Sequence, residues 1–502
     1  MTDPKTTEEE SQLRSLKPQG SFAGDVLKLA GGTTLAELLT VLAAPILSRI
    51  YVPSAFGTTD VFVSITGIIG VVACLRYELA MMLPERDEDA AHLLAISLCS
   101  VLMISGVSAL CILLGRGFLV RLLKAPELSP YLWLLPIAVF ARGVFMALSY
   151  WNSRTKRYGR LSVAHIAQST AANGVQLAMG IAGQAHAGGL IGSRMLGQAV
   201  SSFGLGWMTW REDRHVLSRM CWKRAIETMK RYRKFPLVST WSGLLNTLSV
   251  QLPTLLLSAF FTQTVVGYYA FGSRMIQLPM ILIGNAIGQV FFQRASKAKN
   301  EGVLDLVVLN TYSRLLDIGL FPMLVLGVIG REVFVVAFGP QWAEAGVYVQ
   351  IISLWRFFVF IGSPLSTLFP VLERQEIGLA FNIVLLLSRI LSLILGGLFG
   401  NARVALLLYA ASGLVMFAWL LMWLLHASGV SIWKAMGDTG GRLVYLAPTL
   451  LLLFAAKYWW QWSAYHIVVL AGTSAFVYYG ILIWRDPTLM KFVCRMWQGL
   501  RK

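Results

Sequence analysis

Fourteen apolar runs, most of them longer than 20 residues, follow one another along this chain. A helix rises about 1.5 Å per residue and the hydrocarbon core of a bilayer is about 30 Å thick, so roughly 20 apolar residues cross it. Backbone N–H and C=O groups in lipid must form their hydrogen bonds within the same segment, which restricts such apolar runs to helices. The predicted spans are residues 25–50, 57–83, 90–114, 129–150, 161–183, 188–210, 237–261, 265–292, 304–329, 343–371, 376–399, 402–425, 442–457 and 464–484.

This pattern predicts an all-α polytopic membrane protein with about 14 transmembrane helices. The thirteenth run is the shortest, and a count of 12 follows if the last pair is interfacial. The composition agrees, because 56% of the 502 residues are hydrophobic and only 14% are charged.

The net charge of +18 raises the question of a nucleic-acid partner. With the amino terminus inside, the loops on that side hold 28 Lys and Arg residues, the opposite loops hold 6, and 9 lie inside spans. Such asymmetry is what membrane topology requires, so it predicts two cytoplasmic termini and no nucleic acid. The first 24 residues are polar and predict a cytoplasmic tail without a cleaved signal peptide. The five cysteines have no spacing typical of a metal site or a disulfide framework.

A weak internal repeat divides the chain. Pro53-Ser-Ala-Phe-Gly57 joins spans one and two, and Gln263-Thr-Val-Val-Gly267 joins spans seven and eight. The two joints lie six helices apart, so the repeats share one orientation and predict two parallel six-helix lobes around a central cavity. The expected parts are a tail (1–24), a first lobe (25–210), a basic cytoplasmic linker (211–236), a second lobe (237–425), an extra helix pair (426–484) and a basic tail (485–502).

The hairpin of spans seven and eight carries polar residues on one face of each helix. Ser242, Asn246 and Ser249 follow helical spacing in the first span. In the second span the polar face consists of Arg274, Gln277, Asn285 and Gln289. An arginine inside a membrane is costly unless it faces a wet cavity or a partner, so this hairpin is interpreted as one wall of a polar chamber.

Several motifs of the chain resemble those of the polysaccharide-transporter (Wzx-like) oligosaccharide/lipopolysaccharide flippases, within the multidrug/oligosaccharidyl-lipid/polysaccharide exporter superfamily. They are Tyr232-Arg-Lys-Phe-Pro-Leu, Gln251-Leu-Pro253, Gly267-Tyr-Tyr, Ile283-Gly-Asn-Ala-Ile-Gly-Gln-Val-Phe-Phe, Leu47-Ser-Arg-Ile-Tyr-Val-Pro and Arg76-Tyr-Glu-Leu-Ala. The resemblance implies a transporter that works by alternating access of two lobes. It also implies functional roles for Arg274, Arg49 and Arg76, whose motifs align with the family.

Arginines within the spans form the candidate substrate site. Arg142, Arg194, Arg274 and Arg356 have no acidic residue within one turn of their own helices and are assigned to a cationic cavity. Four residues near span ends also suit a structural ion pair or a snorkelling role, namely Lys28, Arg49, Arg76 and Arg389. The complete predicted cavity set is Arg274, Arg194, Arg356, Arg142, Arg49, Asn246, Gln277, Asn285 and Gln289.

Four acidic residues also lie inside the predicted spans. Glu37, Asp60 and Glu78 are candidates for ion coupling, because a buried carboxylate can exchange protons during transport. The simpler alternative is that Glu37 or Glu78 neutralises a neighbouring arginine. Arg314 and Asp317 are three residues apart and predict a structural ion pair.

An excess of intramembrane arginine suits an anionic solute such as a diphosphate. With the resemblance, it predicts a flippase that moves an undecaprenyl-diphosphate-linked oligosaccharide repeat unit from the cytoplasmic to the outer face of the bacterial inner membrane. The expected partners are this lipid, anionic lipids, the polysaccharide polymerase and other assembly proteins. The alternative is a cation-coupled antiporter for drugs and organic cations from the same superfamily. Short loops and the lack of a paired-acid, nucleotide or metal motif argue against an enzyme, and no cofactor is expected.

Overall fold

The computed structural model describes residues 22–217 and 222–485, and within these residues the secondary structure is helical without strands. Fourteen of the described helices have 20 or more residues, and each coincides with one predicted span. They are α2 (Phe22–Ile50), α3 (Pro53–Val72), α5 (Asp87–Leu122), α6 (Leu135–Arg154), α7 (Tyr158–Ile181), α8 (Ala187–Leu217), α10 (Thr240–Phe260), α11 (Gln263–Glu301), α12 (Leu304–Phe338), α13 (Ala343–Leu365), α15 (Gln375–Leu398), α16 (Ala402–Ala427), α17 (Ile432–Tyr458) and α18 (Ala464–Arg485).

Eleven of these helices are long and apolar enough to cross a membrane, which confirms an all-α, multi-pass membrane protein. The eleven include α17 and α18, so the last pair resembles spanning helices more than interfacial ones. The other three are α7, α8 and α11. Polar side chains of α7 and α8 line the cavity described below, whereas α11 has some side chains outside the described part of the structure.

Several observed helices differ in length from the predicted spans, and two of these differences involve charged residues. The thirteenth run was predicted to begin at residue 442, but α17 begins ten residues earlier, at Ile432. Arg442 explains the difference, because its guanidinium binds Asp317 of α12 at 2.6 Å and also Asp438 on its own helix. The second run breaks after α3, where Leu75 and Arg76 adopt left-handed backbone angles (φ 49° and 62°) before the short α4 (Tyr77–Ala80).

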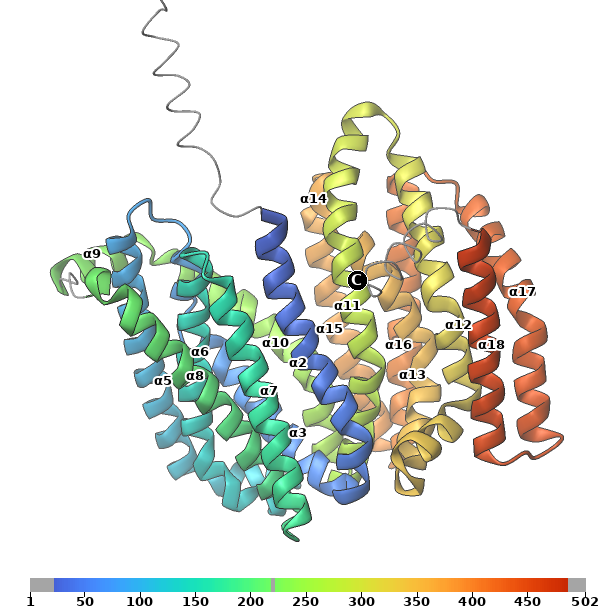
Figure 1. Ribbon diagram of the computed structural model, residues 1–502, viewed down its shortest axis with the longest axis horizontal. Coiled ribbons are helices and arrows are strands. Elements are labelled where there is room, and N and C mark those ends of the chain that lie inside the picture. Colours follow the sequence, from blue (N-terminus) through green and yellow to red (C-terminus); the bar gives the residue numbers. More distant parts are fainter. Residues whose placement is uncertain (1–21, 218–221, 486–502) are drawn as a thin grey trace, which may run out of the picture.

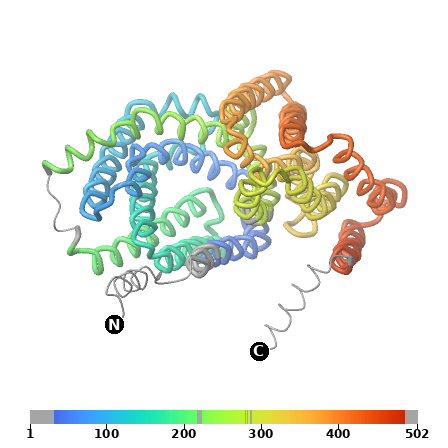
Figure 2. The backbone as a smooth tube through the Cα atoms, turned by 90° about the horizontal axis from the view of Figure 1, so that it is seen from above, coloured from blue at the N-terminus to red at the C-terminus, as the bar shows by residue number. Residues whose placement is uncertain are grey.

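The long helices form two groups that lie side by side (Figures 1 and 2). Helices α3 and α5 to α8 lie on one side, α11 to α16 lie on the other, and α17 and α18 form the outer edge of the second group (Figure 1). Helix α10 connects the groups by packing against both α3 and α15. The residue boundaries of the two lobes stay a prediction, since α10 was assigned to the second lobe and also packs on the first.

The two repeat joints meet at one end of the bundle, in a contact that we call the glycine crossing (Pro53–Gly57 with Gln263–Gly267). A Cβ atom on Gly57 would lie 1.8 Å from the carbonyl oxygen of Gln263, and one on Gly267 would lie 1.9 Å from the carbonyl oxygen of Pro53. Only glycine leaves room for such an approach of two backbones. The reciprocal contact shows that α3 and α11 begin at the same end of the bundle.

An aromatic cluster covers the glycine crossing. The ring of Phe271 lies 5.4 Å from Phe56 and 4.2 Å from Trp342, centroid to centroid. All three side chains are buried, and the Trp342 indole donates a 2.8 Å hydrogen bond to the carbonyl oxygen of Ser48 at the end of α2. The ends of α2, α3, α11 and α12 are therefore held together at one point.

Replacing Gly57 or Gly267 with alanine places a methyl carbon 1.8 or 1.9 Å from a backbone oxygen, far closer than van der Waals contact allows. We expect either substitution to lower the free energy of unfolding by about 1–3 kcal/mol or more, because overpacking at a backbone contact forces the helices apart. Thermal unfolding of the full chain in detergent measures the change. Gly106→Ala in α5 is the matched control, because its Cβ meets no atom within 4 Å. Equal melting temperatures for the three variants would contradict this account.

Candidate functional site

A cavity of about 900 Å³ lies among α2, α3, α6, α7 and α8, and α11 also contributes to its lining. We call it the arginine cavity. Its polar lining side chains are Glu37, Thr40, Asp60, Thr66, Arg142, Ser149, His165, Gln168, Ser169, Asn173, Gln176, Arg194, Gln198 and Arg274. The cavity thus collects polar groups from both sides of the internal repeat.

Helix α7 supplies the largest share of the polar lining because its polar residues recur at helical spacing along one face. Asn173 donates hydrogen bonds to the hydroxyl oxygens of Thr40 on α2 (3.2 Å) and Ser169 (3.1 Å). Gln168 donates to the side-chain oxygen of Gln198 on α8 at 3.0 Å. These bonds hold the neighbouring helices together and satisfy amides that would be costly in an apolar environment.

Three arginines from three helices enter this cavity. Arg194 of α8 forms an ion pair with Asp60 of α3 at 3.4 Å. Arg142 of α6 extends across Gly70 of α3, and its side chain remains exposed although it belongs to the middle of the bundle. Within the part of the chain that the structure describes, neither Arg142 nor Arg274 has an ion-pair partner.

The charges of the cavity leave an excess of one positive charge. Three arginines face two carboxylates, Asp60 and Glu37. Guanidinium groups present several donors in a fixed plane that matches phosphate or carboxylate oxygens. The cavity is therefore chemically suited to an anionic group that carries hydrogen-bonding substituents.

Five of the predicted cavity residues lie elsewhere in the structure. Arg49 donates hydrogen bonds to the carbonyl oxygens of Pro45 (3.0 Å) and Val336 (3.3 Å), so it joins α2 to α12 at the bundle end. This is the structural role of a residue at a span end. The other four, which are also absent from the cavity lining, are Arg356, Asn246, Gln277 and Gln289. The side chain of Asn285, like that of Lys28, lies outside the described residues.

Two predicted acidic residues have partners outside the cavity. Glu78 does not reach the cavity, because it is fully buried and forms an ion pair with Arg76 at 3.5 Å, at the break after α3. Asp317 pairs with Arg442 of α17, so the sequence prediction gave it the wrong partner. The partner of Asp317 belongs to another helix, whereas Arg76 lies two residues before Glu78, as the simpler alternative from the sequence expected. Glu37 and Asp60 do lie in the cavity, and their role in ion coupling stays a prediction.

The predicted site also omitted the polar face of α7. His165, Gln168, Ser169 and Gln176 share one face in the sequence, and this signal alone could have placed α7 beside the arginines. Among the described residues, no group of three or more His, Cys, Asp or Glu side chains has the proximity that a metal ion requires.

Asp60→Asn leaves Arg194 without its carboxylate partner inside the bundle. Both side chains are about one-fifth exposed. We therefore expect the free energy of unfolding to fall by about 1–3 kcal/mol, which lies between the values for exposed and buried ion pairs. Adding Arg194→Gln should restore part of it, because no unpaired charge then remains. Thermal unfolding of the single and double variants tests this.

The control for this cycle is the exposed pair of Arg374 and Glu376 (3.6 Å). There we expect Glu376→Gln to change the free energy of unfolding by less than about 1 kcal/mol. A double variant at Asp60 and Arg194 that is no more stable than Asp60→Asn would contradict the assigned pair.

Comparisons with known proteins place the chain in a family. A family model described as "Polysaccharide biosynthesis protein" matches residues 46–347, which is more than half of the chain. No curated protein matches the sequence. Among solved structures, the lipid II flippase MurJ in an inward closed conformation is similar, with a TM-score of 0.67, 12% identity, and coverage of 89% of this chain and 98% of MurJ.

Two structures of multidrug resistance MATE family transporters of the MOP superfamily are also similar. The inward-facing one has a TM-score of 0.57 and 16% identity, and covers 81% of this chain and 96% of its own. The outward-facing one has a TM-score of 0.53 and 13% identity, and covers 81% and 97%. At these identities the likeness shows a shared fold. The chain belongs to the polysaccharide biosynthesis protein family and has the fold shared by MurJ and the MATE transporters.

Proposed function

We propose that this protein is a flippase that moves an undecaprenyl-diphosphate-linked oligosaccharide from the cytoplasmic to the outer face of a bacterial inner membrane, for the synthesis of O-antigen, capsule or exopolysaccharide. The arginine cavity is the observation that carries the proposal, because three arginines from α6, α8 and α11 meet only two carboxylates there. The family match supports a role in polysaccharide synthesis, and the fold of a lipid II flippase supports a lipid-linked substrate.

In this proposal the diphosphate binds the arginines while the sugars bind the amides of α7 and α8. Arg142 and Arg274 offer guanidinium donors without an ion-pair partner among the described residues. Arg194 would exchange its bond to Asp60 for one to a phosphate oxygen. Gln168 and Gln198 offer amide donors and acceptors of the kind that sugar hydroxyls bind. Substrate binding then separates Arg194 from Asp60. The two conformations of alternating access would therefore interact differently with the substrate.

We propose further that both termini are cytoplasmic and that the glycine crossing lies at the outer face. The distribution of Lys and Arg supports this orientation. In this orientation α9 (Trp222–Arg231) lies at the cytoplasmic leaflet, where its basic residues suit anionic lipids. Polysaccharide polymerase and other assembly proteins are the expected protein partners. The solved proteins with a similar fold are named as a flippase and as transporters, and we propose no catalytic activity.

The MATE likeness favours a second candidate, a cation-coupled antiporter for organic cations. The cavity charge argues against it, because a cationic solute would face three arginines and two acids. Resistance to cationic dyes in cells that express the protein would favour this second function. Glu37 and Asp60 would then be the expected ion-coupling residues, and Glu78, which pairs with Arg76, would be excluded from that role.

Deleting the gene should cause lipid-linked oligosaccharide to accumulate at the cytoplasmic face and surface polymer to fall. Each guanidinium contact contributes about 1.5–3 kcal/mol, so we expect Arg142→Gln or Arg274→Gln to lower transport about tenfold or more in complemented cells. Extraction and quantification of the lipid intermediate, with surface polymer measured in parallel, checks both expectations.

The control variant is Arg374→Gln, which removes an exposed arginine outside the cavity and should complement fully. Unchanged lipid intermediate and polymer after deletion would refute the proposed substrate. Full activity of both cavity variants would refute the proposed site.

A further inference from the structure

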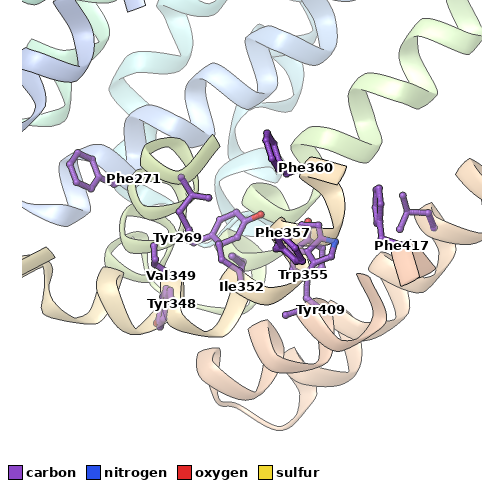
Figure 3. Packing of buried hydrophobic residues seen from close by; sticks show 14 of the residues in the cluster. Tyr269, Phe271, Tyr348, Val349, Ile352, Trp355, Phe357, Phe360, Tyr409 and Phe417 are labelled. Carbon is purple, nitrogen blue, oxygen red and sulfur yellow. The ribbon is translucent and has the colours of Figure 1, made fainter. Parts of the chain in front are cut away.

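Two further arginines lie close to the indole ring of Trp355, in the helix group that contains α13 and α15. The guanidinium carbon of Arg356 on α13 is 4.6 Å from the ring centroid, and that of Arg389 on α15 is 5.7 Å from it. Arg389 also lies 5.9 Å from the ring centroid of Tyr409. Figure 3 shows Trp355 beside Tyr409 and Tyr269 in the packed interior. We call the following set the second arginine cluster: Arg356, Arg389, Trp355, Tyr409, Tyr269 and Ser249 of α10.

No carboxylate neutralises this cluster. The five helices that surround it, α10, α11, α13, α15 and α16, contain three acidic residues, all close to helix ends. Each already has a basic partner: Glu301 pairs with Lys297, Glu344 with Arg403, and Glu376 with Arg374. On the adjacent helix α12, Asp317 and Glu332 pair with Arg442 and Lys457. Two positive charges therefore lie close together inside the bundle. Their contacts with aromatic rings offset the electrostatic cost only in part.

The cluster also has donors that lack acceptors. Within the described residues, the Nε atoms of Arg356 and Arg389 are buried and make no hydrogen bond. Arg389 Nη1 donates only to the carbonyl and hydroxyl oxygens of Ser249, at 3.4 and 3.2 Å. The Trp355 side chain, 2% exposed, has a buried Nε1 without a partner as well. Unsatisfied buried donors are rare in proteins, and several in one place indicate an absent acceptor.

We propose that the second arginine cluster is an anion site that binds a phosphate group, separate from the arginine cavity. Each guanidinium group presents several N–H donors in one plane. Two such groups match the several oxygens of a phosphate better than they match an acceptor with a single oxygen. The bond between Arg389 and Ser249 lies at the contact of α15 with α10, and both helices expose large apolar side chains, such as Leu387 and Val250. A phosphate carried by a lipid headgroup reaches this contact from the bilayer, and a free phosphate reaches it from water.

This site does not depend on the proposed function of the arginine cavity. Neither Arg356 nor Arg389 lines that cavity, and α11 lies between the two sites, with Arg274 lining the cavity and Tyr269 packed against Tyr409. The two sites can therefore be tested separately with one purified protein.

The test measures the melting temperature of the full chain in detergent with three additives: dioleoyl phosphatidic acid, uncharged dioleoylglycerol and inorganic phosphate. We expect phosphatidic acid to raise the melting temperature and dioleoylglycerol to have no such effect, because a ligand that binds the folded state stabilises it. A rise with phosphate as well shows that the phosphate group alone suffices, and a rise with phosphatidic acid alone shows that the lipid is the source. No rise with either would overturn the proposal.

Arg356→Gln and Arg389→Gln should weaken the apparent affinity for phosphatidic acid about tenfold or more, as expected for a lost charge-assisted bond. Arg374→Gln, which removes an exposed arginine, should leave it unchanged. If Arg389→Gln does not fold, Arg389→Lys keeps the charge but loses the planar donors, and should still weaken binding. Equal affinity in all variants would overturn the assignment to this cluster.

Discussion

The close approach of two backbones at the glycine crossing positions the rest of this structure. Because Gly57 and Gly267 lack side chains, α3 and α11 begin at one point and rise together from it. Asp60 lies three residues beyond the first glycine and Arg274 seven beyond the second, or about 4.5 and 10 Å along the helices. Residues from both repeats therefore reach one cavity, and the aromatic rings of Phe56 and Phe271 separate it from the crossing.

Charge inside the membrane is the second constraint, and the structure meets it in two ways. Structural charges are paired across helices, as in Arg442 with Asp317 or Lys457 with Glu332. The arginines of the cavity and of the second arginine cluster exceed the carboxylates near them. Helix α11 separates these two cationic regions, so each of the two helix groups contains one region with excess positive charge. Unbalanced arginines are costly in lipid, and their placement in two defined regions favours anionic ligands over a purely structural role.

The sequence predicted the fourteen long helices well, since apolar runs of spanning length have few alternatives in a bilayer. It also assigned Arg142, Arg194 and Arg274 to one cavity, because each lacks an acidic residue within one turn of its own helix, and the structure brings these three side chains into one cavity lining. The structure places Arg49 and Arg356 outside this lining, since helical periodicity gives the face of a residue but not the helix that this face meets. The pairing of Asp317 with Arg442 was hidden for the same reason, as 125 residues separate the two.

The central claim is that the arginine cavity binds the diphosphate of a lipid-linked sugar. The most direct measurement is native mass spectrometry of the full chain with undecaprenyl-diphosphate-linked sugar, compared with a variant that combines Arg142→Gln, Arg194→Gln and Arg274→Gln. We predict that the natural protein retains this lipid and prefers it to uncharged undecaprenol, and that the triple variant loses the preference while remaining folded. Equal retention of the diphosphate lipid by both proteins would contradict the claim.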